Sequence, residues 1–374
     1  MKPVFFIIGL LIVYGSLYPF NFHAAPAGAW TAFFASWHSF TGRGDALSNI
    51  LLFAPFGYFG VLAYGRKAWL AAAALLLAVG VQVLQVYLPG RDANLQDVSW
   101  NMLGVALGAG LTLLPWLRFT RTGNAGGRHV NAALLLIGCW LAYRLMPFVP
   151  GIDWQLWKDS LKPLLLHPRL SPIGLLHDAV AWAVVACLWP QVCRYRRAGL
   201  YLLLLIAAVF ALEVMIVKNS LSANNVLGAL LGLGLWFLWP GRGHFGRLWL
   251  ILLLMLSLLL SGLAPFQLRP VPGDFHWLPF HGFLGGSMLI NISVVFEKGF
   301  FYGALILLLQ QESGRFRFAV VTAFLLMLLI EIGQLFVYAH TAEITDPLLV
   351  LLIAMALKAV GGESLPQRPR RLVP

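Results

Sequence analysis

The chain has 374 residues, of which 60% are hydrophobic and 11% are charged, and its mean hydropathy is +0.81. A soluble domain needs about 25% charged residues to solvate its surface, so this composition excludes a soluble globular protein. The net charge of +12 is compatible with nucleic-acid binding. In membrane proteins, however, excess Lys and Arg orient the helices, and we predict no nucleic-acid partner.

Apolar residues occur in blocks of about 17–22, the length that crosses a hydrocarbon core of about 30 Å as a helix. Runs such as Leu248–Leu260 do not alternate, which excludes a porin-like barrel. We predict an all-α, polytopic membrane bundle of about twelve transmembrane helices. The predicted spans are residues 3–19, 46–64, 68–88, 99–117, 130–147, 174–192, 198–217, 223–240, 246–264, 287–309, 317–338 and 345–360.

The basic residues predict the orientation of these spans. With the N-terminus inside, 17 of the 26 Lys and Arg residues fall on the cytoplasmic side, together with only two acids, Glu312 and Glu363. Basic residues in short loops stay cytoplasmic, so both termini are predicted to be cytoplasmic. An even number of spans likewise places the two termini on the same side of the membrane.

Two predicted non-cytoplasmic connections are long, at residues 21–44 and 148–172, and each carries two Trp residues. Such segments lie in the membrane interface or form simple external loops, and the sequence leaves both open. The first span also resembles a signal peptide, with small residues after it. We predict that it is retained, because similar spans recur later in the chain.

A threefold internal repeat is predicted from a span followed by Pro-Phe, which occurs at Pro19, Pro147 and Pro265. Each Pro-Phe is followed by a polar stretch and three more spans. Repeats 1 and 2 share Asn-x-x-Gly in their fourth span, and repeats 1 and 3 share a polar pair followed by Asp fifteen residues on. We therefore predict domains at 1–122, 123–241 and 242–364, with a basic cytoplasmic tail at 365–374.

Repeat 1 has the most polar residues at one predicted membrane depth, near the non-cytoplasmic surface. Amides, carboxylates and one guanidinium at that depth suit a polar headgroup or sugar. The alternative is that they cap helix ends and cross-link three helices. These candidate ligand-binding residues are Asp45, Asn49, Gln82, Gln85, Arg91, Asp97 and Asn101. Gly104 and Gly108 then form a small-residue face for close helix packing.

The other repeats offer fewer candidates. Repeat 2 has His177-Asp178, Glu213, Lys218 and Asn225. Among these, Glu213 and Lys218 suit an ion pair on the surface. Repeat 3 has Asn291, Glu297-Lys298, Gln334, His340 and Glu343, together with two carboxylates, Glu331 and Asp346. These last two are the candidate catalytic residues, as a general acid and base, although no recognised catalytic signature is present. No Cys or His spacing resembles a metal site, and we expect no metal and no cofactor.

The repeat 1 pattern resembles the VanZ-like family, named after a teicoplanin-resistance protein. The resemblance rests on Asp45, Asn49-x-x-x-Phe53-x-Pro55-x-Gly57, Gln82-x-x-Gln85, Arg91, Asp97 and Asn101-x-x-Gly104-x-x-x-Gly108. Gln82 replaces the Glu usual in the family, whereas Glu331 keeps it. Repeat 3 has Val350 in place of the Asn and loses both glycines. The resemblance implies three fused VanZ-like units, two of them degenerate, in a bacterial envelope protein from an antibiotic-resistance-related family.

We hypothesise a bacterial cytoplasmic (inner) membrane protein that binds an envelope lipid or a lipid-linked glycan precursor at its non-cytoplasmic face. Membrane lipids are its expected partners. One alternative is a membrane-embedded enzyme that acts on such lipids. Another is a transporter, although transporter sites usually lie near the midplane of the membrane.

Overall fold

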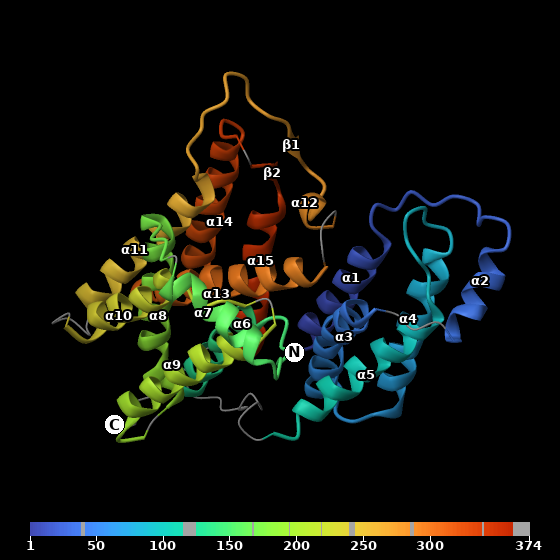
Figure 1. Cartoon of the computed structure of the whole chain (residues 1–374), viewed down its shortest axis with the longest axis horizontal. Coiled ribbons are helices and arrows are strands. Elements are labelled where there is room, and N and C mark those ends of the chain that lie inside the picture. The colour runs from blue at the N-terminus through green and yellow to red at the C-terminus, as the bar shows by residue number, and fades with distance from the viewer. Residues whose placement is uncertain are drawn as a thin grey trace, which may run out of the picture. The chain divides into compact units, whose positions relative to one another are not determined.

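The structure is a computed structural model that describes residues 1–38, 42–114, 125–166, 168–193, 195–217, 219–238, 244–284, 288–338 and 340–361. The regular structure of the described chain is helical, as predicted, except for one two-stranded sheet that the sequence did not predict. It divides into two compact units (Figure 1). We call Met1–Gly123 with Lys358–Pro374 the N-terminal unit, and Asn124–Leu357 the C-terminal unit.

The N-terminal unit contains five α-helices and one short 3₁₀ helix among its described residues. They are α1 (Lys2–Leu17), α2 (Ala29–Ala35), η1 (Ser36–His38), α3 (Arg43–Tyr64), α4 (Ala68–Gln85) and α5 (Leu95–Leu111). Helices α3, α4 and α5 pack on one another, and α1 packs on α3 and α4. Phe5, Ile12 and Phe53 lie at the centre of the apolar core that these helices share.

The C-terminal unit holds the remaining helices and the sheet. They are α6 (Ala125–Leu145), α7 (Trp154–Leu165), α8 (Pro172–Val192), α9 (Ala198–Met215), α10 (Ala223–Leu238), α11 (His244–Leu263), β1 (Phe275–His276), α12 (His281–Leu284), α13 (Met288–Ser313), α14 (Phe316–Gln334), β2 (Ala342–Glu343) and α15 (Thr345–Gly361). Strand β1 pairs in parallel with β2. Trp140, Trp182 and Phe300 are buried at the centre of this unit, where α6, α8 and α13 meet.

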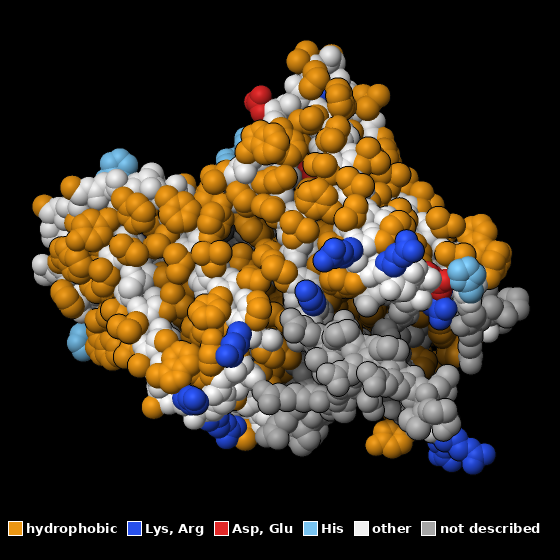
Figure 2. All heavy atoms as spheres, turned by 180° about the vertical axis from the view of Figure 1, so that it is seen from behind, with side chains coloured by type: hydrophobic (Ala, Val, Ile, Leu, Met, Phe, Trp, Pro, Cys, Tyr) orange, Lys and Arg blue, Asp and Glu red, His pale blue; other side chains and the backbone are white. Residues whose placement is uncertain are grey.

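Seven described helices are long and apolar enough to cross a membrane. They include most of α3 and α13 and the whole of α4, α8, α9, α11 and α14. Three shorter apolar segments lie within α1, α6 and α10, and α5 and α15 have 17 residues each. Large apolar side chains remain exposed on these helices, for example Leu76 and Leu230. Hydrophobic side chains dominate the described surface in Figure 2, as lipid contact requires.

Helix ends follow local sequence signals. Asn94, Asp153 and Ser171 each accept a backbone N–H in the first turn of α5, α7 and α8. Gly65 and Gly314 take positive φ where α3 and α13 end, a conformation that glycine adopts without steric cost.

The three Pro-Phe sequences form the same turn. Each proline follows a cis peptide bond, and Phe20, Phe148 and Phe266 have φ of 62°, 61° and 59°. Positive φ is uncommon for residues other than glycine. Each of these Phe residues also donates its backbone N–H to the carbonyl three residues earlier. The first helix of each predicted repeat therefore ends in one shared geometry.

The predicted connection at 148–172 contains α7. This helix carries charged residues such as Lys158 and Asp159, while Trp154 and Leu165 nearby are apolar and exposed. Ser160 anchors it by donating to the backbone oxygen of Asn219 at 3.1 Å. Such an amphipathic surface helix matches the predicted interfacial segment, although an external loop helix stays the alternative.

Candidate functional site

Three of the repeat 1 candidates meet at one end of α3, α4 and α5. Gln82 uses its side-chain oxygen to accept the backbone N–H of Asn94 at 2.9 Å, and its nitrogen lies 3.5 Å from Asp97 Oδ2. The side chain of Asn49 also hydrogen-bonds Asp97. Asp45, one turn before Asn49, is exposed and contributes a second negative charge near Asp97.

Gln85 and Arg91 face the end of α1 instead. Gln85 Nε2 donates to the carbonyl of Ser16 at 2.9 Å, and Arg91 Nη2 donates to the carbonyl of Tyr18 at 3.1 Å. The last carbonyls of a helix have no partner within the helix, so these side chains complete the end of α1. These two residues therefore make the contacts expected if the polar residues cap helix ends and cross-link helices.

Asp97 and Asn101 keep unused acceptors. They lie four residues apart on one face of α5. Within the described residues, Asp97 Oδ1 and Asn101 Oδ1 are buried and have no hydrogen-bond partner. A buried acceptor without a donor costs free energy, and a donor group on a ligand would recover it.

A polar cavity of about 400 Å³ lies within the C-terminal unit. This volume falls within the about 300–1,000 Å³ typical of small-molecule sites. Residues of α8, α11, α13, α14 and α15 line it. The polar ones are His177, Ser261, Glu297, Lys298, Tyr302, Gln334, His340 and Asp346.

Asp346 anchors one wall of this cavity. Lys298 Nζ donates to Asp346 Oδ1 at 2.5 Å, and Tyr302 Oη donates to Asp346 Oδ2 at 2.7 Å. Lys298 occupies, at the offset that aligns Gln82 with Glu331, the position of Asn49 in repeat 1. The pairs Asn49–Asp97 and Lys298–Asp346 therefore join matching helices.

His177 lines the cavity from α8. Its Nδ1 lies 3.0 Å from Ser257 Oγ, and its Nε2 lies 3.2 Å from Glu297 Oε1. The imidazole packs against the ring of Phe301, with 4.0 Å between ring centroids. These contacts hold the imidazole between α11 and α13.

Glu331 lies behind the cavity rather than in its lining. Its side chain is 2% exposed, and Oε2 accepts the backbone N–H of Glu343 at 2.8 Å. Asp346 and Lys298 are its charged neighbours. The two candidate catalytic carboxylates are thus close to each other, but both oxygens of Asp346 and one of Glu331 accept hydrogen bonds from the protein.

Gln334 and His340 repeat the role that Gln85 and Arg91 have in repeat 1. Gln334 Nε2 donates to the carbonyl of Gly262 at 3.0 Å, and His340 Nε2 contacts the carbonyl of Ala264. Gly262 and Ser16 each stand three residues before the Pro of a Pro-Phe turn. In repeat 2, Asn219 Nδ2 donates at 3.0 Å to the carbonyl of Arg144, which stands at the same distance from its proline.

The side chain of Arg144 makes a buried ion-pair network in the C-terminal unit. Its guanidinium lies 2.6 Å from Glu213 and 3.4 Å from Asp178, and all three side chains are mostly buried. Glu213 therefore pairs inside the bundle. Lys218, its predicted surface partner, lies outside the described residues.

Several cavity residues were absent from the candidate set. His177, Glu297 and Lys298 were noted as polar residues of repeats 2 and 3, whereas Ser261 and Tyr302 carried no sequence signal of their own. The offset between repeats 1 and 3 identifies Lys298, since it aligns with Asn49. Within the described residues, no group of three His, Cys, Asp or Glu side chains is arranged to hold a metal ion.

Hydrocarbon-length apolar helices with buried polar networks at their ends define a multi-pass helical membrane protein. Residues 6–117 match the family model VanZ/LLP1, so the predicted resemblance is confirmed over this segment, which covers α3, α4 and α5. No curated protein and no solved structure matches the chain.

Proposed function

We propose that the chain crosses the bacterial cytoplasmic membrane twelve times, as three repeats of four spans, with both termini in the cytoplasm. Each predicted span overlaps a described helix. The excess of Lys and Arg in one set of short connections supports the orientation. The repeat boundaries at 122/123 and 241/242 stay predictions.

The matching turns support the repeat. All three Pro-Phe turns share their backbone conformation. In all three, the carbonyl three residues before the proline accepts a side-chain amide, from Gln85, Asn219 or Gln334. Independent sequences would have no reason to reproduce this contact at one position.

We further propose that the protein binds the polar head of an envelope lipid or a lipid-linked glycan precursor at its non-cytoplasmic face. The observation that carries this proposal is the polar cavity of the C-terminal unit. It lies at the starts of α8 and α15 and the ends of α11 and α14, and beside the middle of α13. In the proposed topology all of these helix ends face the non-cytoplasmic side.

The chemistry of the cavity suits a hydroxyl-rich head. Lys298 and His177 supply donors, while Glu297 and Asp346 supply acceptors. Each donor lies beside an acceptor, His177 beside Glu297 and Lys298 beside Asp346. A neutral polyol can insert between such pairs without leaving a charge unpaired, whereas a single strong charge on the ligand would break one pair. In repeat 1, the unused acceptors on Asp97 and Asn101 offer a second polar lining.

Native mass spectrometry of the full-length protein in nanodiscs tests this function. The probes are a polyprenyl-diphosphate-linked disaccharide and the polyprenyl phosphate without sugar. We expect retention of the sugar-bearing probe, weakened about tenfold by His177→Ala, since one hydrogen bond is worth about 1.4 kcal/mol here. Ser261→Phe should also weaken it, because the ring fills the cavity while Ser261 bonds only carbonyls of its own helix.

The control is Lys162→Met on α7. Lys162 lies 2.5 Å from Asp159 with both side chains half exposed, and its hydrogen bond lowers the pKa of that carboxyl. Removing this exposed ion pair should leave probe retention unchanged. Equal retention by wild type and Ser261→Phe, or equal retention of both probes, would overturn the proposed function.

A further inference from the structure

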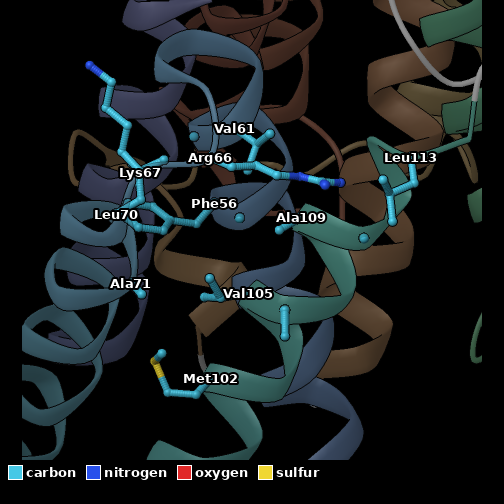
Figure 3. A pocket seen from close by; sticks show the side chains of 14 residues that line it. Phe56, Val61, Arg66, Lys67, Leu70, Ala71, Met102, Val105, Ala109 and Leu113 are labelled. Atoms are coloured by element: carbon cyan, nitrogen blue, oxygen red, sulfur yellow. The ribbon is translucent and has the colours of Figure 1, made fainter.

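The N-terminal unit contains an apolar groove, separate from the polar cavity and absent from the proposed function. It has a volume of about 440 Å³ and is lined by α3, α4, α5 and the turn between α3 and α4. Several small residues are among those that line it, for example Gly57, Gly60 and Gly110. Figure 3 shows Val105 and Met102 along its length.

Positive charge gathers at one end of this groove only. Arg66 extends across that end towards Leu113, and Lys67 projects outward beside it (Figure 3). Lys2 joins them from α1, with its amine 5.4 Å from the ring centroid of Tyr64 at the end of α3. Among the described residues, neither Arg66 nor Lys67 forms an ion pair.

The length of the groove matches one leaflet of a bilayer. Met102 and Gly110 lie eight residues apart on α5, which is about 12 Å at about 1.5 Å per residue. Half of a hydrocarbon core of about 30 Å is about 15 Å. In the proposed topology, the cationic end of the groove lies at the membrane surface and its apolar end lies near the midplane.

We propose that this groove holds one acyl chain of an anionic phospholipid, whose phosphate binds Arg66. A guanidinium forms paired hydrogen bonds with a phosphate. In a zwitterionic lipid, the cation of the head group partly offsets the attraction between that phosphate and the guanidinium. Lys67 and Lys2 add attraction for anionic lipid, which basic residues beside membrane spans provide. In the proposed topology this lipid belongs to the cytoplasmic leaflet, opposite to the polar cavity.

The test is lipid competition on the full-length protein. Purified protein in detergent receives equal amounts of phosphatidylglycerol and phosphatidylcholine, and native mass spectrometry counts the bound lipids. We expect one phosphatidylglycerol retained in preference to phosphatidylcholine. Arg66→Gln should lower this preference about fivefold, the effect of one basic residue at a membrane surface.

Gly110→Leu tests the groove itself. An added Cβ at Gly110 meets no atom within 4 Å, so the substitution fits the fold while its side chain enters the groove. Its matched control is Gly80→Leu on α4, where a Cβ also meets nothing within 4 Å but the residue does not line this groove. The first variant should lose the bound lipid, and the second should keep it.

Arg315→Gln is the charge control, since Arg315 also stands between two spans but outside the groove. Equal loss of preference in Arg315→Gln and Arg66→Gln would reduce the effect to general surface charge and overturn the proposal. If Gly110→Leu retains the bound lipid while Arg66→Gln loses the preference, the head group binds but the acyl chain does not occupy the groove. That result would also overturn the proposal. Ser261→Phe should leave this lipid bound, which separates the outcome from that of the polar cavity.

Discussion

Buried carboxylates in this protein are held by the backbone as well as by cations. Glu331 accepts the backbone N–H of Glu343 just before α15, and Thr345 Oγ donates to Glu343 at 2.5 Å. Thr345 Oγ also accepts the N–H of Phe280. This chain of contacts ties the connection between α14 and α15 to the start of α12.

The backbone contact of Glu331 gives a prediction that separates structure from chemistry. Glu331→Gln keeps an oxygen for the Glu343 N–H and nearly the same side-chain shape, so the fold should keep its stability. Glu331→Ala leaves that N–H buried without a partner and should cost about 1–3 kcal/mol. Thermal unfolding followed by intrinsic fluorescence in detergent measures both.

If Glu331→Gln retains wild-type function, the acid–base role that the sequence suggested for Glu331 is excluded. A large loss of stability in Glu331→Gln would instead contradict the structural role. Asp346→Asn provides the comparison, because it weakens the ion pair with Lys298 as well.

At the residue scale, sequence reasoning placed the polar side chains at the correct helix ends but not their partners. Gln85 and Arg91 were grouped with Asp97 by depth, yet their donors reach carbonyls of α1. Depth is readable from position in a span. The direction of a long side chain depends on which helix packs beside it, and a single sequence does not contain that information.

At the element scale, glycine decides how closely two helices approach. A Cβ at Gly104 or Gly108 would overlap backbone atoms of Ile50 or Ala54 on α3. Gly228 and Gly232 stand in the same relation to α8. In repeat 3 the aligned positions are Ile353 and Leu357, so its second and fourth helices cannot make this glycine contact.

Substitution of glycines on α5 should therefore distinguish the effect of helix–helix packing from the effect of helix propensity. Gly108→Leu forces α3 and α5 apart, and overpacking of this kind costs about 1–3 kcal/mol or more. Gly110→Leu, two residues on, should be neutral or stabilising, because it faces open space and improves helix propensity. The yield of monodisperse protein and its thermal midpoint compare the two variants. Equal effects of both substitutions would contradict the close approach of α3 and α5.

Helix positions were predictable because hydrophobic length and the turns that end each span are both local signals. The small-residue face of Gly104 and Gly108 was predicted for the same reason. The polar cavity was not, since it needs residues of five helices from two predicted repeats. Contacts of that kind depend on the packing of distant segments.

At the scale of the whole molecule, the proposed orientation assigns the polar cavity and the apolar groove to opposite sides of the membrane. In a variant without Cys139, Cys187 and Cys193, a cysteine at Lys158 on α7 should react with a membrane-impermeant maleimide in intact spheroplasts. A cysteine at Ser313, the last residue of α13, should react only after permeabilisation, since an even number of spans separates it from the cytoplasmic N-terminus. The reverse pattern would invert the topology and move the polar cavity to the cytosol.

The contact before each Pro-Phe turn leaves its acceptor residue free to vary. The acceptor is a main-chain oxygen, which every amino acid carries, so only the donors Gln85, Asn219 and Gln334 are constrained. The acceptor residues are accordingly Ser, Arg and Gly. At position 144 that freedom accommodates an arginine whose side chain pairs with two buried acids. If the proposed repeats arose by duplication, a turn held in this way would let them diverge in side-chain chemistry while their backbone geometry is retained.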